Sequence, residues 1–323
     1  MVTTTAIRVK SGPLRIRRLS GGVRRPVVLS GALLDIPRKE DSQVSKDTGP
    51  APGRYPVDSG EVELLRDLDR PTGWVLMMGG VPQSYVDLAD PAYLDFDYVR
   101  LMADVIDCLP PGPLDVTHVG GGAFTLPRYV AATRTGSHQI VAEPDAALVQ
   151  LVRERLRLKS VPRLKVRVMG GREVVQGLGD ESADLFVLDA FVAATMPVEL
   201  ATAEYMGDIA RVLKPRGTLL VNAADGKGLA FVRRLAATVR GTFTNVVLLA
   251  EPGILRGRRF GNLILAASRG PLPYEELNRK AARGLQRARC VYGDDLVNFV
   301  AGAAPIRDGE PVVAPVPPPA VFG

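Results

Sequence analysis

The sequence predicts an α/β protein with a doubly wound, mostly parallel seven-stranded sheet, preceded by a small antiparallel β cap. Three observations indicate this fold. From Leu114 onward, short apolar runs alternate with stretches of amphipathic helical spacing, a pattern typical of a parallel sheet covered on both faces. The first of these runs ends in three consecutive glycines, 120–122. Ahead of them, residues 57–92 contain short strand-like runs separated by turn residues.

Length and composition restrict the class of protein. The chain has 323 residues, enough for one large domain with a small one attached. It has no uninterrupted apolar run of about 18 residues, the length that predicts a membrane span. Its first twelve residues lack the apolar segment of a secretory signal. We therefore expect a cytoplasmic protein with no membrane partner. With only 2 histidines and 2 cysteines, unclustered, we expect no metal site.

The basic character of the chain is confined to its N-terminal part. Residues 1–54 contain 11 basic and 4 acidic residues, whereas the remainder contains 30 basic and 31 acidic ones. We interpret 1–56 as a basic, partly disordered arm that ends in a Pro/Gly-rich linker. Nucleic acid is not the favoured partner, because no aromatic residues interleave these charges as stacking platforms would.

Order is expected to resume with the cap, 57–92, and to continue through a nucleoside-binding domain, 93–302. A helix over 93–109 should stop at Pro110-Pro111. The last two strands have a short connection and should therefore pair as an antiparallel hairpin at one edge. The tail, 303–323, is rich in Pro and Val and is predicted to be unstructured. Cap strands are predicted at 62–65, 74–77 and 81–85, and sheet strands at 114–119, 139–143, 164–168, 183–189, 218–222, 243–250 and 260–267. Further helices are predicted at 125–134, 145–157, 199–213, 227–239, 274–288 and 294–301.

The triple-glycine stretch is the strongest indication of a ligand. A strand followed by Gly120, Gly121 and Gly122 and then a helix brings backbone N–H groups close to a bound group. Glu143 ends the next strand, where a carboxylate can accept both hydroxyls of a ribose. The alternative is an ordinary turn without a ligand. Thr125 replaces the third glycine of the dinucleotide pattern, which favours an adenosyl group without phosphates over NAD.

Other residues stand at carboxyl ends of the predicted strands, where ligands bind in such sheets. Gly170, Gly171 and Arg172 follow the third strand, where glycines would let the backbone approach a flat base. Asp189 ends the fourth strand and could orient a nucleophile or, alternatively, cap the following segment. His118 lies inside the first strand, where we expect a hydrogen-bonded core imidazole.

Several motifs, in the same order along the chain, resemble the spermidine synthase family of aminopropyltransferases, which have the Rossmann-like class I S-adenosylmethionine methyltransferase fold. The resemblance covers 80–268. It implies that Gln83 contacts the nucleoside, that Tyr98 shapes the pocket and that Glu143 binds the ribose. The matching segments are GGVPQSYVD at 79–87, VGGGAFTLPRY at 119–129 with Arg128 in place, VAEPD at 141–145, SADLFVLDAF at 182–191 and LATAEYMGDIARVLKPRGTLLVNA at 200–223.

The chain departs from the family where the family binds amines. Ala123 replaces the acid of the glycine turn, Gly171 replaces the acid that reads the adenine, and Val192 replaces the second acid of the fourth strand. Val99 stands where the family has a histidine. The segment 253–262 replaces the family's tyrosine-bearing segment and brings in Arg256, Arg258 and Arg259.

The resemblance implies a small-molecule transferase that forms a homodimer. The donor would be S-adenosylmethionine or its decarboxylated form, leaving S-adenosylhomocysteine or methylthioadenosine. We predict that Asp189 and Tyr98 serve catalysis, and that the glycine turn, Gln83, Glu143, Gly171, Arg172 and Asp189 bind the donor. If the arginines of 253–262 face the pocket, the acceptor should be neutral or anionic and not a simple diamine. A methyltransferase proper and a catalytically inactive nucleoside-binding paralogue are the alternatives.

Overall fold

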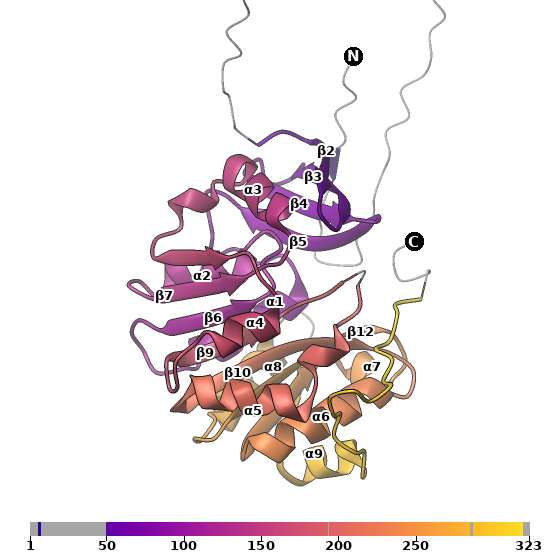
Figure 1. Cartoon of the computed structure of the whole chain (residues 1–323). Helices are drawn as coiled ribbons and strands as arrows, with labels where there is room; N and C mark the ends of the chain where they lie inside the picture. Colours follow the sequence, from indigo (N-terminus) through magenta and orange to yellow (C-terminus); the bar gives the residue numbers. More distant parts are fainter. Residues whose placement is uncertain (1–5, 8–49, 193, 285–286, 319–323) are drawn as a thin grey trace, which may run out of the picture.

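Two sheets make up the framework of the computed structural model, which describes residues 6–7, 50–192, 194–284 and 287–318 (Figure 1). The larger one has eight strands in the order β8-β7-β6-β9-β10-β12-β11-β13. The pairs from β8 to β10 are parallel, and those from β10 to β13 are antiparallel. The strands are β6 (Asp115–Val119), β7 (His138–Ala142), β8 (Leu164–Arg167), β9 (Ala183–Leu188), β10 (Leu213–Asp225), β11 (Asn245–Ala250), β12 (Gly261–Ser268) and β13 (Arg289–Val291).

Helices cover both faces of this sheet. Along β9, the side chains alternate between the two covers: Phe186 and Leu188 pack in the core with α4, α5, α6 and α9, whereas Leu185 and Val187 pack with α1, α2 and α8. The helices are α1 (Asp97–Asp107), α2 (Thr125–Thr133), α3 (Ala146–Arg155), α4 (Gly171–Gln176), α5 (Ala203–Val212), α6 (Ala230–Thr242), α7 (Pro252–Leu255), α8 (Tyr274–Arg283) and α9 (Gly293–Val300). In the described part of the chain, no helix combines the length and the apolar character needed to cross a bilayer.

The chain order reverses beside β6, since β7 pairs on one side of it and β9 on the other. In open α/β sheets, a reversal of this kind leaves a crevice outside the carboxyl ends of the two strands. The glycine turn follows β6 and therefore lies at this crevice.

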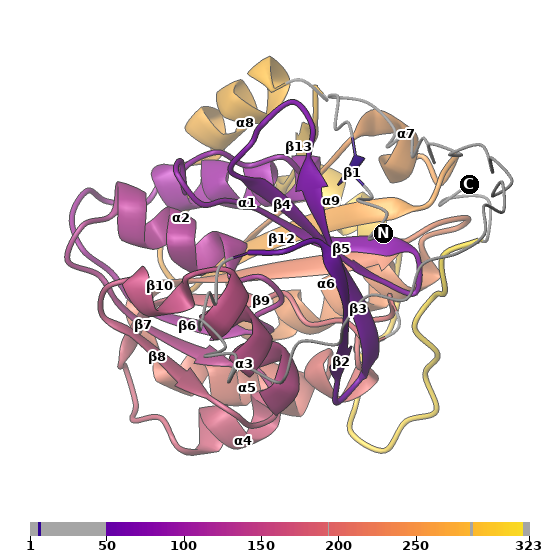
Figure 2. The ribbon, with the colours of Figure 1, turned by 90° about the horizontal axis from the view of Figure 1, so that it is seen from above.

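The smaller sheet is the cap, whose strands cross in front of the large sheet in the view of Figure 2. Its strands pair antiparallel, except that β1 lies parallel to β3. Asp145 fastens the cap to the main domain: its carboxylate accepts hydrogen bonds from the amide of Ser59 at 2.9 Å and from the amide of Leu148, at the start of α3, at 2.7 Å. The strands are β1 (Ala6–Ile7), β2 (Gly53–Val57), β3 (Gly60–Asp67), β4 (Gly73–Met78) and β5 (Val81–Asp87).

The predicted fold class is confirmed, with three differences in detail. The hairpin of β11 and β12 forms as expected, but it is not the edge, because the three-residue β13 pairs outside β11. The turns α4 and α7 were not predicted, being too short to show a helical period. Cap strand β2 begins inside the stretch interpreted as a linker, which was predicted to end at 56, and runs to Val57.

The prediction of an unstructured tail is wrong for residues 303–318. Ile306 is fully buried there, and its amide donates to the Thr238 hydroxyl at 2.8 Å. A proline-rich segment can pack along helices without forming regular structure, so its composition alone does not reveal this contact. The predicted arm lies outside the described residues except for 6–7 and 50–56, as does the end of the tail, 319–323.

We expect Asp145→Asn to lower the free energy of unfolding near pH 7 by about 1–3 kcal/mol, because a buried ionised acceptor of several amides is lost. Burial raises the pKa of Asp145, but hydrogen bonds from Ser59, Leu148 and Asp58 outweigh it, so the folded-state pKa lies below the ordinary value. The stabilisation is therefore present above the unfolded-state pKa and is lost as the pH falls through the folded-state pKa. Denaturant titrations across this range measure it. A pH-independent difference would contradict the assignment, and Asp180→Asn, at an exposed ion pair, is the control.

Candidate functional site

A cleft of about 1510 Å³ lies between the cap and the carboxyl ends of the parallel strands. Its walls come from the glycine turn, the ends of β7, β9 and β10, the start of α4 and the cap strands β4 and β5. All the site residues predicted from the sequence line this one cleft: Gln83, Tyr98, Gly120, Gly121, Gly122, Glu143, Gly171, Arg172 and Asp189. The structure thus brings together residues that span more than 100 positions of the chain.

The glycine turn is constrained by close backbone contacts. Gly120 has a φ of 95°, and a Cβ placed on it would lie 2.1 Å from the carbonyl oxygen of Asp189. Gly122 has a φ of 51°, and its Cβ would lie 2.5 Å from the Ser84 hydroxyl of the cap. Side chains at these positions would collide with β9 or with the cap, so the turn can only be built from residues without them.

Glu143 points at this turn. One oxygen of its carboxylate accepts the amide of Gly121 at 2.9 Å and that of Gly122 at 3.4 Å. The other accepts the amide of Asp145 at 3.1 Å. The side chain is 8% exposed and lines the cleft. A carboxylate oxygen has two lone pairs, so the oxygen that holds both glycine amides is fully engaged, whereas the one bonded to Asp145 can still accept one hydroxyl. The carboxylate predicted to bind a ribose therefore lines the cleft with one free acceptor site.

Thr125, which stands where the dinucleotide pattern has its third glycine, bonds the cap. The hydroxyl of Thr125, the first residue of α2, donates to the carbonyl of Tyr85 in β5 at 2.9 Å. Beside it, the amide of Ala123 donates to the Ser84 hydroxyl at 3.2 Å. The turn that contacts the cleft thus also fastens β5 of the cap to the main domain. No sequence pattern indicated this contact, because Ser84 and Ala123 are 39 residues apart.

Asp189 ends a chain of side-chain amides. The amide of Asn222 donates to its carboxylate at 2.8 Å, and the amide of Asn262 in turn donates to the oxygen of Asn222 at 3.0 Å. Burial raises the pKa of Asp189 to about 6, although the bond from Asn222 opposes the shift. Tyr98 lies against it, and burial together with the negative charge of Asp189 raises the pKa of the phenol. Asn262 was not anticipated: nothing in its local pattern marks it as a site residue.

His118 is the core imidazole that the sequence predicted. Its Nε2 lies 2.9 Å from Oε1 of Gln139, whose Nε2 donates to the carbonyl of Pro127 at 2.9 Å. This arrangement leaves Oε1 as the acceptor, so the imidazole donates from Nε2. Burial lowers the pKa of His118 to about 4. The ring is therefore neutral near pH 7.

Gly171 and Arg172 reach the cleft in different ways. A Cβ on Gly171 would lie 2.6 Å from Cγ1 of Val119, so this glycine permits close packing of α4 on β6. The guanidinium of Arg172 donates to the Thr202 hydroxyl at 2.7 Å and to Asp308 at 3.0 Å. Its side chain is thus engaged by the protein, although the residue lines the cleft.

The arginines of 253–262 were expected to reverse the charge of the pocket only if they face it, and the structure does not meet this condition. Arg256, Arg258 and Arg259 do not line the cleft, and Arg259 pairs with Glu251 at 2.6 Å. The short helix α7 begins this segment and leaves Phe260 and Asn262 to form the wall. Of the described residues that line the cleft, Arg54 and Arg172 are the basic ones, and both are paired with carboxylates.

The chain is similar to known polyamine enzymes. No family model matches it. A polyamine aminopropyltransferase of Vibrio vulnificus is 23% identical over 207 residues, which are 63% of this chain and 66% of that relative. A crystal structure of a probable spermidine synthase from Corynebacterium glutamicum is 30% identical, with a TM-score of 0.76, and the match covers 82% of this chain and 100% of that chain.

Two further structures share the fold at lower identity. Spermidine synthase from Thermotoga maritima is 18% identical, with a TM-score of 0.54 over 78% of this chain and 83% of that one. A spermidine synthase in complex with the transition-state analogue AdoDATO is 18% identical, with a TM-score of 0.52 over the same shares.

We expect Asp189→Asn to raise the free energy of unfolding at pH 8 by up to about 2–3 kcal/mol. A carboxylate whose pKa rises from 3.8 to about 6 on folding destabilises the folded state once the pH exceeds its unfolded-state pKa. The difference should therefore vanish below about pH 4. Chemical denaturation of both proteins at pH 4, 6 and 8 measures it. A variant less stable than the parent at pH 8 would contradict the assigned direction of the shift.

Proposed function

Because the chain belongs to the spermidine synthase-like family, with the class I methyltransferase fold, we propose that it transfers an alkyl group from an adenosyl sulfonium to a small acceptor. The donor is S-adenosylmethionine or its decarboxylated form, and the transferred group is accordingly methyl or aminopropyl. The observation that carries the proposal is the Glu143 carboxylate held against the glycine turn inside the cleft.

The residues of the cleft fit such a donor. The glycine turn and Glu143 line the cleft, and one oxygen of the Glu143 carboxylate keeps a lone pair for a ribose hydroxyl. A pyrophosphate would need the space at the start of α2, which Thr125 uses to hold the cap. The relative in complex with AdoDATO supports the same class of donor.

The chemistry requires alignment more than acid–base help. A sulfonium supplies a good leaving group, because breaking its carbon–sulfur bond releases a neutral thioether. The acceptor's nucleophile forms the new bond to that carbon as the carbon–sulfur bond breaks, and its proton passes to the Asp189 carboxylate and from there to solvent. In this proposal Asp189 accepts a hydrogen bond from the nucleophile and orients its lone pair toward the carbon, which is the main source of acceleration. Tyr98 and Gln83 shape the space on the cap side.

The acceptor is proposed to be a small molecule other than a simple diamine. The residues after Asp189 turn an apolar wall toward the cleft: Phe191 lines it, and Val192 is 66% exposed. Asp189 has a raised pKa and no cationic partner among the described residues, whereas both guanidiniums in the lining are paired. A carboxylate without a cationic partner, beside guanidiniums that are already paired, favours a neutral nucleophile or one with a single ammonium group over an anionic acceptor.

Calorimetric titration of the purified protein with each donor form tests the proposal. We expect one form to bind, and Glu143→Ala to weaken it about 10–100-fold, because charge-assisted hydrogen bonds to the ribose are lost. Asp189→Asn should lower single-turnover transfer about 100-fold or more, a much larger effect than its effect on donor affinity. Asp180→Asn, on the surface, is the control.

The outcomes separate the alternatives. Failure of both donors to bind the parent protein would refute the proposed function. Binding of the carboxylated form, with methyl transfer, would identify a methyltransferase proper. Binding without transfer to amines or small neutral acceptors would identify an inactive paralogue.

Val192→Asp should shift acceptor preference toward diamines, because a carboxylate three residues after Asp189 can hold a second ammonium. We expect the ratio of kcat/KM for a diamine to that for an alkyl monoamine of equal length to rise about tenfold or more. Val192→Asn controls for polarity without charge. An equal ratio in the parent and both variants would show that this wall does not contact the acceptor.

A further inference from the structure

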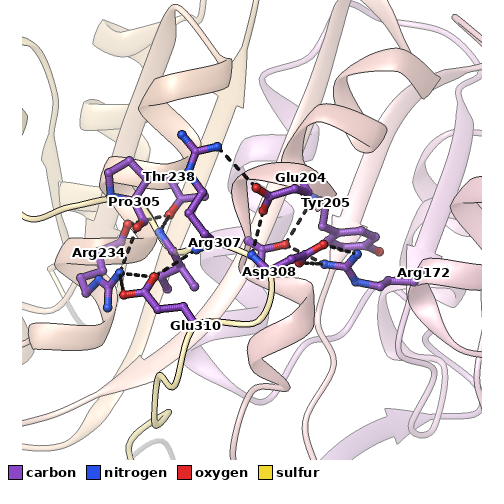
Figure 3. Close-up of polar contacts among 11 residues, drawn as sticks. Arg172, Glu204, Tyr205, Arg234, Thr238, Pro305, Arg307, Asp308 and Glu310 are labelled. Atoms are coloured by element: carbon purple, nitrogen blue, oxygen red, sulfur yellow. Dashed lines mark hydrogen bonds and ion pairs between the residues drawn. The ribbon is translucent and has the colours of Figure 1, made fainter.

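The C-terminal strap, residues 303–318, is fastened to the outside of the main domain at α6. There Arg234 donates to both carboxylate oxygens of Glu310, each at 2.7 Å, and to the carbonyl of Pro305 at 2.9 Å (Figure 3). The amide of Ile306 donates to the Thr238 hydroxyl, also on α6. We call this set of contacts the outer anchor. None of its residues lines the cleft.

A second set of contacts, the inner anchor, lies at the wall of the cleft. The two terminal nitrogens of Arg172 bind the two oxygens of Asp308, one at 3.0 Å, and the guanidinium also donates to Thr202 and to the carbonyl of Glu199 (Figure 3). The amide of Asp308 donates to Glu204 at 3.0 Å. A fork-to-fork pair of this kind fixes orientation as well as distance.

The inner anchor acts on residues that form the cleft. Arg172 is the second residue of α4 and follows Gly170 and Gly171, which line the cleft. Gly171 packs so closely on Val119 that a Cβ would not fit, and Val119 directly precedes the glycine turn. Arg172 is therefore linked through Gly171 to the floor beside the turn. Further along the strap, Pro317 itself lines the cleft.

We propose that Asp308 is a positioning residue for the donor site, which holds Gly170 and Gly171 in place through Arg172. Docking of the strap and binding of the donor then favour each other. By linkage, the factor by which the docked strap strengthens donor binding equals the factor by which the donor strengthens docking. The inference rests on the proposed function for the identity of the donor.

Donor titration of two strap variants tests the proposal. Asp308→Asn removes a charge from the inner anchor, and Glu310→Gln removes one from the outer anchor of the same strap. We expect Asp308→Asn to raise the Kd of the donor about fivefold or more, Asp308→Glu to recover part of this loss, and Glu310→Gln to leave the Kd within about twofold. Melting temperatures of the variants show whether stability changes in parallel. Equal effects of Asp308→Asn and Glu310→Gln on the Kd would overturn the proposal.

Hydrogen exchange supplies a test that does not need the donor. In the free protein, Asp308→Asn should speed amide exchange over 171–175 about fivefold or more, whereas Glu310→Gln should change it less than twofold. Saturating donor should slow exchange over 306–312 in the parent and not in Asp308→Asn. Unchanged exchange over 171–175 in Asp308→Asn would overturn the positioning role. If the parent binds neither donor form, the proposed function fails, while this donor-free comparison still decides the role of Asp308.

Discussion

The hydrogen bonds between the Glu143 carboxylate and the amides of the glycine turn organise the rest of the site. They join the ends of β6 and β7, the two strands on one side of the chain reversal. The same turn meets β9 at Gly120 and the cap at Gly122, where no side chain would fit. The ends of β6, β7 and β9 and the cap thus meet at the three glycines. The cleft is the space that remains between these parts.

Several of the charged residues that line this cleft are paired or hydrogen-bonded within the protein, so a count of charges does not describe its electrostatics. Arg54 and Arg172 are compensated by Glu61 and Asp308, and Glu143 and Asp145 are satisfied by backbone amides. Asp189 differs from them, because its described hydrogen-bond partner is the neutral amide of Asn222 and its pKa is raised by burial. A destabilised carboxylate at the end of a strand is typical of functional sites, where stability is given up for reactivity.

The sequence predicted what depends on local pattern. The glycines of 120–122 and Glu143 follow rules of spacing and strand ends, and so they led directly to the cleft. Contacts between segments that are far apart in the sequence could not be predicted in this way. Arg172 was predicted to bind the donor, but no local signal showed that Asp308, 136 residues away, would bond its guanidinium. A reversed pocket charge was predicted only if the arginines of 253–262 face the pocket, and charge alone could not show that Arg256, Arg258 and Arg259 lie outside the lining.

Thr125 shows how one hydroxyl can limit the evolution of a binding site. Exchanging it for glycine would complete a dinucleotide fingerprint in the sequence, but would also remove one of the hydrogen bonds that hold β5 against the start of α2. The attachment of the cap and the size of the ligand that fits the crevice therefore depend on the same residue. A variant of this chain that acquired a longer, phosphate-bearing ligand would have to keep its cap in place through the remaining contacts, those of Ser84 and Asp145.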